Sequence, residues 1–310
     1  MKEQDYPWLY QASEQVSGAA QQWYFRALYS QLALFLAVSL LAAIPTWISL
    51  GSSVVHRFSI AIAIVLAIGL VFFWTVRGKK LDKRWFDARA AAESAKTLTW
   101  RYMMLIPPFQ AEDTADDKLL ITELEAVRTS FLSSARSMEK QSNIQISEPM
   151  RAVRRKTFEE RKTFYVSFRA AEQRDWYQKK AVANRGKSNQ WFWAVLLVQV
   201  IALAWAALRA LNIIHMAPTG PLMTVAASFS AWALAKRHDE LAMAYAMTAE
   251  ELKSLTDKVE RCSEETEFLG YAGDVEGAIS REHTMWRARR NVAASAQGFL
   301  DRQEAFDDQK

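Results

Sequence analysis

Cysteine is almost absent from this sequence, which holds a single one, Cys262, in 310 residues. One cysteine cannot form an internal disulfide bond or build a cysteine metal cluster, so both are excluded. A buried free thiol in a reducing compartment is the expected state. The first 30 residues contain no long apolar stretch, which predicts that no signal peptide is removed.

Glycine and proline are also scarce, with 10 and 7 residues, and this scarcity favours helices over a turn-rich sheet. Catalytic motifs are lacking as well. The sequence contains no metalloprotease motif, nucleophile elbow or phosphate-binding loop, and its histidines are scattered, at His56, His215, His238 and His283. It therefore predicts no catalytic residue, no cofactor and no metal site, and we expect a protein that is not an enzyme.

Charge is missing from four apolar segments, each of about the length that crosses a bilayer, roughly 20 residues. The segments are residues 31–50, 58–76, 190–208 and 221–235. The last is the least apolar because it contains Thr224, Ser228 and Ser230. A soluble four-helix core is the alternative, but the helices of such a core keep a polar face, which these segments lack.

Short links at 51–57 and 212–220 pair these segments into two transmembrane hairpins. Lys and Arg follow the hairpins closely, for example at Lys79, Lys80 and Lys236, and are few in the links. Because loops rich in Lys and Arg stay in the cytoplasm, both termini are expected there. The predicted fold class is an all-α integral membrane protein with two tandem transmembrane helical hairpins, four spans and long cytoplasmic helical extensions.

The polar regions are expected to be helical too. Residues 77–104 are predicted to continue the second span as one long helix, and further helices are predicted at 118–140 and 150–185. The last polar segment is predicted to continue the fourth span and to break near Gly270 and Gly273.

The two polar regions carry opposite charge. Residues 77–189 contain 24 Lys and Arg against 15 Asp and Glu, a net charge of +9, and residues 236–310 contain 11 against 16, a net charge of −5. Opposite charge favours docking of one region on the other, within or between subunits. The alternative, in which the basic helix lies near anionic lipid headgroups, is equally open.

A short pattern occurs twice, as AESAKTL at 92–98 and AEELKSL at 249–255. Each copy follows a hairpin, and a Trp-Tyr pair precedes each hairpin, at Trp23 and at Trp176. The match at both ends predicts an internal duplication in parallel orientation. Within each copy, Glu and Lys three residues apart are expected to form helix-surface pairs, namely Glu93 with Lys96 and Glu250 with Lys253.

This architecture resembles the SLATT domains, the two-transmembrane effector domains associated with SMODS nucleotidyltransferases and SLOG sensors. The segment 279–290 (ISREHTMWRARR) is similar to the closing signature of one subgroup. The resemblance implies a pore-forming effector of a bacterial anti-phage system in the inner membrane, triggered by a nucleotide second messenger or a partner. Since the chain has no fused nucleotide-sensing domain, a separate nucleotide-signalling sensor protein is the partner it implies.

Polar side chains within the spans are the candidate functional residues. Gln199 is the only strongly polar one deep in the third span, and Thr224 and Ser228 lie one turn apart in the fourth. They are interpreted either as pore-lining residues or as contacts between helices, where small and polar residues also gather. No nucleic-acid partner is expected, because the basic run 151–156 lacks interleaved aromatic residues.

The predicted domains are a first two-span unit at 1–110, a helical connector at 111–160 and a second two-span unit at 161–310. Four spans are too few for a wide pore, so a homo-oligomer embedded in the lipid bilayer is expected. The hypothesis is a non-enzymatic membrane effector that forms a pore or disrupts the membrane. The alternative is a membrane-anchored helical scaffold or signalling subunit without a pore.

Overall fold

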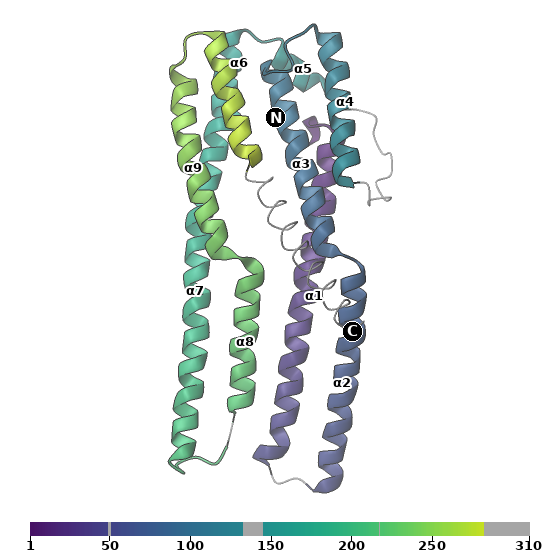
Figure 1. Ribbon diagram of the computed structural model, residues 1–310, viewed down its shortest axis with the longest axis vertical. Helices are drawn as coiled ribbons and strands as arrows, with labels where there is room; N and C mark the ends of the chain where they lie inside the picture. The colour runs from purple at the N-terminus through teal and green to yellow at the C-terminus, as the bar shows by residue number, and fades with distance from the viewer. Residues whose placement is uncertain (49–50, 133–144, 217, 282–310) are drawn as a thin grey trace, which may run out of the picture. The chain divides into compact units, whose positions relative to one another are not determined.

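The computed structural model describes residues 1–48, 51–132, 145–216 and 218–281, and within them the chain is helical with no strand (Figure 1). This confirms the predicted all-α class. The helices are α1 (Trp8–Trp47), α2 (Ser52–Gly78), α3 (Leu81–Met104), α4 (Asp113–Leu132), α5 (Glu148–Arg154), α6 (Phe158–Tyr165), α7 (Ala171–Ala210), α8 (Thr219–Lys236) and α9 (His238–Arg261), with the 3-10 turn η1 (Glu3–Asp5) before α1 and the π-helix η2 (Val166–Ala170) between α6 and α7. Residues 265–281 are also helical.

The chain forms two compact units, and each takes segments from both halves of the sequence. The polar unit consists of Met1–Ala19, Lys83–Gln178 and Ala244–Lys310. The apolar unit consists of Ala20–Asp82 and Lys179–Met243. The order α1, α2, α3 in the first half corresponds to α7, α8, α9 in the second. The division of the sequence at residues 110 and 160 stays a prediction.

The apolar unit contains α2, α8 and the apolar parts of α1 and α7, paired as two antiparallel hairpins (Figure 1). Within the described residues, three helices are long and apolar enough to cross a membrane: Trp8–Pro45, Ser52–Trp74 and Phe158–Ala210. The first three expected spans overlap these helices, although residues 49–50 of the first lie outside the described residues. The fourth lies on α8, which has only 18 residues and is not among the three. Four membrane crossings therefore stay a prediction.

The second helix of each hairpin was expected to continue as one long helix, and that expectation was wrong, because α2 ends at Gly78 and α8 ends at Lys236. The backbone is left-handed at Lys80, with φ of 44°, and at Arg237, with φ of 51°. A left-handed residue ends a helix because its positive φ turns the chain away from the helix axis, while its N–H still caps the last turn, as Arg237 N–H does at the Ala233 carbonyl, 3.0 Å away. Both breaks fall directly after a hairpin, so the duplication extends to this detail.

The predicted helix 150–185 is also interrupted. Thr157 caps the start of α6, and Glu160 accepts a hydrogen bond from the Thr157 N–H at 3.0 Å, which completes a capping box. From Phe158 the helix then runs without interruption to Ala210, over 53 residues. The break expected at Gly270 and Gly273 lies earlier, at residues 262–264, because both glycines sit inside the helix 265–281 with ordinary helical φ.

The core of the polar unit is aromatic. Trp100, Tyr102, Tyr165, Tyr177 and Phe268 are each no more than 1% exposed. Burying each large side chain contributes about 1.5–3 kcal/mol. They are brought together by close packing along α3, whose buried alanines at 88, 91, 92 and 95 leave room for neighbouring helices. This core fixes the polar side chains described next.

Candidate functional site

The first copy of the repeated motif lies on the partly buried side of α3. Glu93 pairs with Arg89 at 2.6 Å, and Arg89 also reaches Glu14 of α1 at 3.1 Å. The Lys96 ammonium lies 5.8 Å from the centre of the Tyr6 ring. Burial lowers the pKa of Lys96 below its ordinary value. The motif here attaches α3 to the N-terminal segment of the chain.

The second copy has a different environment. Glu250 and Lys253 are both exposed on α9, and no ion pair within the described residues involves either. Between them, Leu252 is fully buried in the core of the polar unit. Both copies of the motif therefore pack into the core of the polar unit. Their charged residues differ, because those of the first copy contact other side chains and those of the second are exposed.

A buried ion pair joins the middle of the chain to its last described helix. Arg169 donates from Nε to Glu276 Oε1 at 2.8 Å and from Nη2 to Oε2 at 2.6 Å, and neither side chain is more than 1% exposed. The Tyr165 hydroxyl donates to the same carboxylate at 3.1 Å. The Arg169 guanidinium also lies 5.7 Å from the Trp100 ring of α3. Three helical segments therefore meet at this ion pair.

The local backbone explains why Arg169 points inward. It lies in η2, four residues after Tyr165, so both side chains share one side of the helix and are buried, whereas Phe168 is exposed. Burial opposes the charge on Arg169, yet Glu276 raises the pKa of Arg169 above its ordinary value. Burial, and then Glu276, raise the pKa of Tyr165. Arg169 is therefore charged, and Tyr165 is neutral.

A second buried network surrounds Arg154 in α5. Its guanidinium binds Asp116 at 2.5 Å and Asp113 at 2.9 Å, and donates to the Tyr102 carbonyl at 2.7 Å. The Tyr102 hydroxyl donates to Asp117 at 2.5 Å. Burial raises the pKa of the Asp117 carboxyl and this hydrogen bond lowers it, and the net result is a pKa below the ordinary value. These contacts hold the acidic start of α4 against the end of α3.

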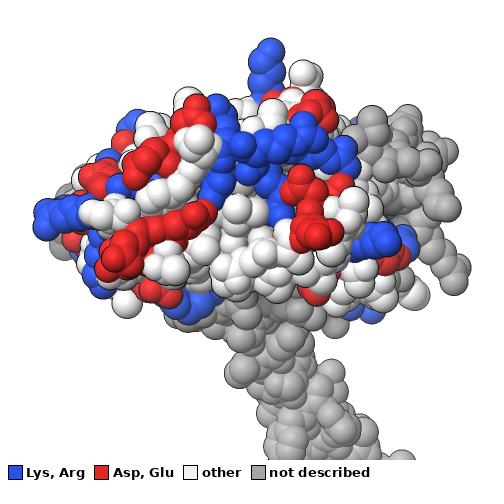
Figure 2. All heavy atoms as spheres, turned by 90° about the horizontal axis from the view of Figure 1, so that it is seen from above, with Lys and Arg blue, Asp and Glu red and all other residues white. Residues whose placement is uncertain are grey.

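Docking between basic and acidic segments occurs within one chain, which confirms that expectation. Besides Arg169 with Glu276, Arg161 pairs with Glu265 and the Lys162 ammonium donates to the Cys262 carbonyl at 2.5 Å. Figure 2 shows Lys and Arg side chains gathered near the centre of the face seen from above, with Asp and Glu beside them. The mixed signs on this face give no basis for a nucleic-acid interface.

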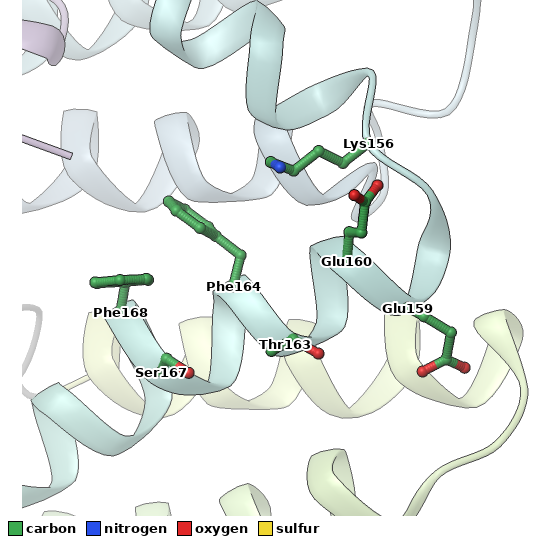
Figure 3. A pocket seen from close by; sticks show the side chains of 7 residues that line it. All are labelled: Lys156, Glu159, Glu160, Thr163, Phe164, Ser167 and Phe168. Carbon is green, nitrogen blue, oxygen red and sulfur yellow. The ribbon is translucent and has the colours of Figure 1, made fainter.

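A shallow groove of about 390 Å³ follows the outer side of α6 and η2 (Figure 3). The rings of Phe164 and Phe168 project from the same side of the helix, 4.8 Å apart, and Lys156 reaches toward them from the preceding turn (Figure 3). Glu159 and Glu160 add acidic groups to the lining. Phe168 is 51% exposed, so the groove presents apolar surface with both signs of charge around it.

The polar residues expected within the spans have separate surroundings. The Thr224 hydroxyl of α8 lies 3.0 Å from Ser39 Oγ of α1 and 3.0 Å from the Gly220 carbonyl, so it links one hairpin to the other. Ser228, one turn on, is partly buried. Gln199 is exposed on α7, and the described residues offer it no hydrogen-bond partner. A pore-lining role for these three residues stays a prediction.

Replacing Thr224 by Val should weaken the contact between α8 and α1 by about 0.6 kcal/mol, because interhelical hydrogen bonds in membranes average that value. The two side chains are similar in size, so packing changes little. Unfolding of the purified protein in a denaturing-detergent titration measures the effect. Ser230→Ala is the control, since its hydroxyl bonds only the Ala226 carbonyl of its own helix at 2.9 Å. Equal losses in the two variants would contradict the prediction.

The buried ion networks are the features that the sequence reasoning missed. Arg169, Glu276, Arg154 and Asp116 lie in segments predicted only as charged helices or loops. For Arg169 and Glu276, the one available signal was the opposite net charge of the two regions, which indicates that they attract but not which residues pair. Arg154 and Asp116 lie in the same region, so that signal does not apply to them.

The cysteine and histidine side chains of the described residues indicate neither a metal site nor a reactive thiol. Among the described residues, no group of three or more His, Cys, Asp or Glu side chains is arranged to hold a metal ion. The Cys262 thiol is buried, and burial raises its pKa, which keeps it protonated and unreactive. His238 bonds Asn184 at 2.7 Å, and burial lowers the pKa of His238. His283 and the signature at 279–290, apart from residues 279–281, lie outside the described residues.

The fold and these contacts define a helical membrane protein whose polar helices are held together by buried ion pairs. Comparison with protein families gives two adjacent matches. The SMODS and SLOG-associating 2TM effector domain 3 matches residues 7–162, and the SMODS and SLOG-associating 2TM effector domain 1 matches residues 165–286. The chain therefore belongs to the SMODS and SLOG-associating two-transmembrane effector family, and it carries two such domains in tandem. No curated protein and no solved structure matches it.

Proposed function

We propose that this protein is a non-enzymatic membrane effector of a bacterial anti-phage system, which assembles as a homo-oligomer and opens a pore or disrupts the inner membrane when triggered. The trigger is a nucleotide signal or a partner protein that acts on the polar unit. Both termini lie in the cytoplasm in this proposal, because Lys and Arg cluster where the hairpins meet the polar segments.

One observation carries the proposal: two effector domains of the two-transmembrane type follow one another in a chain with long, exposed apolar helices. The apolar window of α2 is 0% buried, and those of the other two candidate spans are 11% and 6% buried. Helices with so much apolar surface require lipid or other helices around them. The polar unit supplies the regulated part, because its ion pairs connect segments on either side of each hairpin.

Loss of membrane potential is the expected result of triggering. Cells that carry this gene together with its neighbouring genes should lose the signal of a potential-sensitive dye after phage infection, before lysis. Cells that carry Ile64→Arg should keep it, because an arginine in the centre of α2 costs about 2.5–3.5 kcal/mol in the bilayer. Ile64→Leu is the matched control and should behave as the unmodified protein.

Growth arrest at an unchanged membrane potential would reject the pore and favour the scaffold alternative. Reconstitution separates the two directly. Purified protein in liposomes with an entrapped dye should release the dye when the trigger is added. Protection from phage without dye release or depolarisation would overturn the proposed function.

A further inference from the structure

The exposed side of α7 carries a polar group that no other described residue satisfies. Within the apolar unit, α7 packs inward through Trp191, whose ring lies 5.4 Å from that of Phe229 in α8, and through Ala202, which is 5% exposed. Gln199 lies outside this packed face and is exposed. It stands near the middle of the apolar segment 190–208, so its amide would meet hydrocarbon in a bilayer.

An amide in hydrocarbon needs a hydrogen-bond partner. The Gln side chain has two donors and one accepting oxygen, and no described residue bonds to it. Water is absent from the bilayer core, so leaving these groups unpaired is unfavourable. Thr224 shows the contrast, because its hydroxyl is already paired with Ser39 and Gly220 inside the chain. Among the described residues, none supplies the hydrogen bonds that Gln199 needs, which points to a partner on another molecule.

The surface around Gln199 has the form of a helix-packing stripe. Residues at three- and four-residue spacing from it are exposed and apolar: Phe192 at 62%, Leu196 at 37% and Leu203 at 71%. Ala206, one further step along, is exposed as well. Such spacing places all of them on one side of a helix, and a small residue at one end allows a neighbouring helix to approach closely.

We propose that this stripe of α7 binds the same stripe of a second copy of this chain, with the two Gln199 amides hydrogen-bonded to each other. The amide is self-complementary, since each side chain donates to the oxygen of the other. Copies inserted in one membrane share one orientation, so their Gln199 residues lie at the same depth. A two-fold axis along the membrane normal then brings the same residue of each copy together. The inference rests on the oligomer in the proposed function and identifies its contact surface.

Cysteine crosslinking in native membranes tests the surface. The full chain carrying Cys262→Ser and Gln199→Cys should form a dimer with a short bismaleimide crosslinker. The control is Leu197→Cys in the same background, because Leu197 is 60% exposed at almost the same depth but points about 200° around the helix. It should give no dimer. Equal crosslinking at the two positions, or none at Gln199→Cys, would overturn the proposal.

Two further measurements separate this interface from its alternatives. In a water-filled pore, the Gln199→Cys thiol would react rapidly with a membrane-impermeant thiol reagent and would not crosslink, which would also overturn the proposal. Energy transfer between labelled copies in phosphatidylcholine vesicles gives the association constant. Gln199→Leu should lower it about 3- to 30-fold, whereas Leu197→Ala should leave it unchanged. Association without dye release would reject the pore and retain this interface.

Discussion

Replacing Glu276 by Ala is expected to lower the free energy of unfolding of the polar unit by about 3–5 kcal/mol, because the substitution leaves the Arg169 charge buried without its partner. The carboxylate accepts from Arg169 at 2.8 and 2.6 Å and from Tyr165 at 3.1 Å, so three hydrogen bonds are lost together. Denaturant unfolding of the full chain in detergent, followed by hydrogen exchange in the helix 265–281, measures the loss.

The control for this variant is Glu251→Ala. Glu251 pairs with Arg281 in the same unit, but those side chains are 46% and 61% exposed, so the pair contributes about 0–1 kcal/mol. A double replacement of Arg169 and Glu276 by Leu should recover much of the stability, since no buried charge remains. If Glu276→Ala were no more destabilising than Glu251→Ala, the buried pair would not hold the polar unit together.

Replacing Arg154 by Ala is expected to lower the free energy of unfolding by a similar amount, about 3–5 kcal/mol, because here a buried negative charge loses its partner. It leaves the Asp116 carboxylate, whose side chain is 2% exposed, without a counter-charge, and it removes the donor to the Tyr102 carbonyl. Hydrogen exchange should rise first at the start of α4 and the end of α3, which Arg154 joins. The same denaturant titration gives the overall loss.

Arg155→Ala provides a matched comparison at the next residue. Its ion pair with Glu148 joins side chains that are 57% and 69% exposed, so its removal should change stability by about 0–1 kcal/mol. Both variants remove one positive charge from the same short segment. A similar loss in the two would mean that net charge, and not the buried network of Arg154, stabilises this part of the polar unit.

The sequence predicted the apolar helices well because membrane crossing depends on local composition. A run of about 20 uncharged residues needs no knowledge of its neighbours. Helix ends were predicted less accurately. Lys80 and Arg237 adopt left-handed backbone that neither residue type favours, so no local preference indicates the breaks there. The start of α6, by contrast, has a local signal in the sequence. Thr157 and Glu160 form the Thr-x-x-Glu pattern of a capping box, which predicts a helix start at that position.

The partners of the charged residues could not be read from the sequence. Arg169 and Glu276 are 107 residues apart, and Arg154 and Asp116 are 38 residues apart. Many other Arg and Glu residues in the same segments are compatible with the same periodicity and net charge. Only packing distinguishes them, because an ion pair forms in the interior where the helices exclude water from both groups at once.

By itself, the sequence determined the helical class, the apolar segments and the tandem duplication, since each depends on residues close together in the chain or on the comparison of two stretches. The tertiary structure alone decided that the Lys96 copy of the motif is partly buried and the Lys253 copy exposed, and that, within the part of the chain that is described, Thr224 is paired and Gln199 is not. Burial and pairing are properties of the surroundings that distant segments create, so two similar local sequences have different environments.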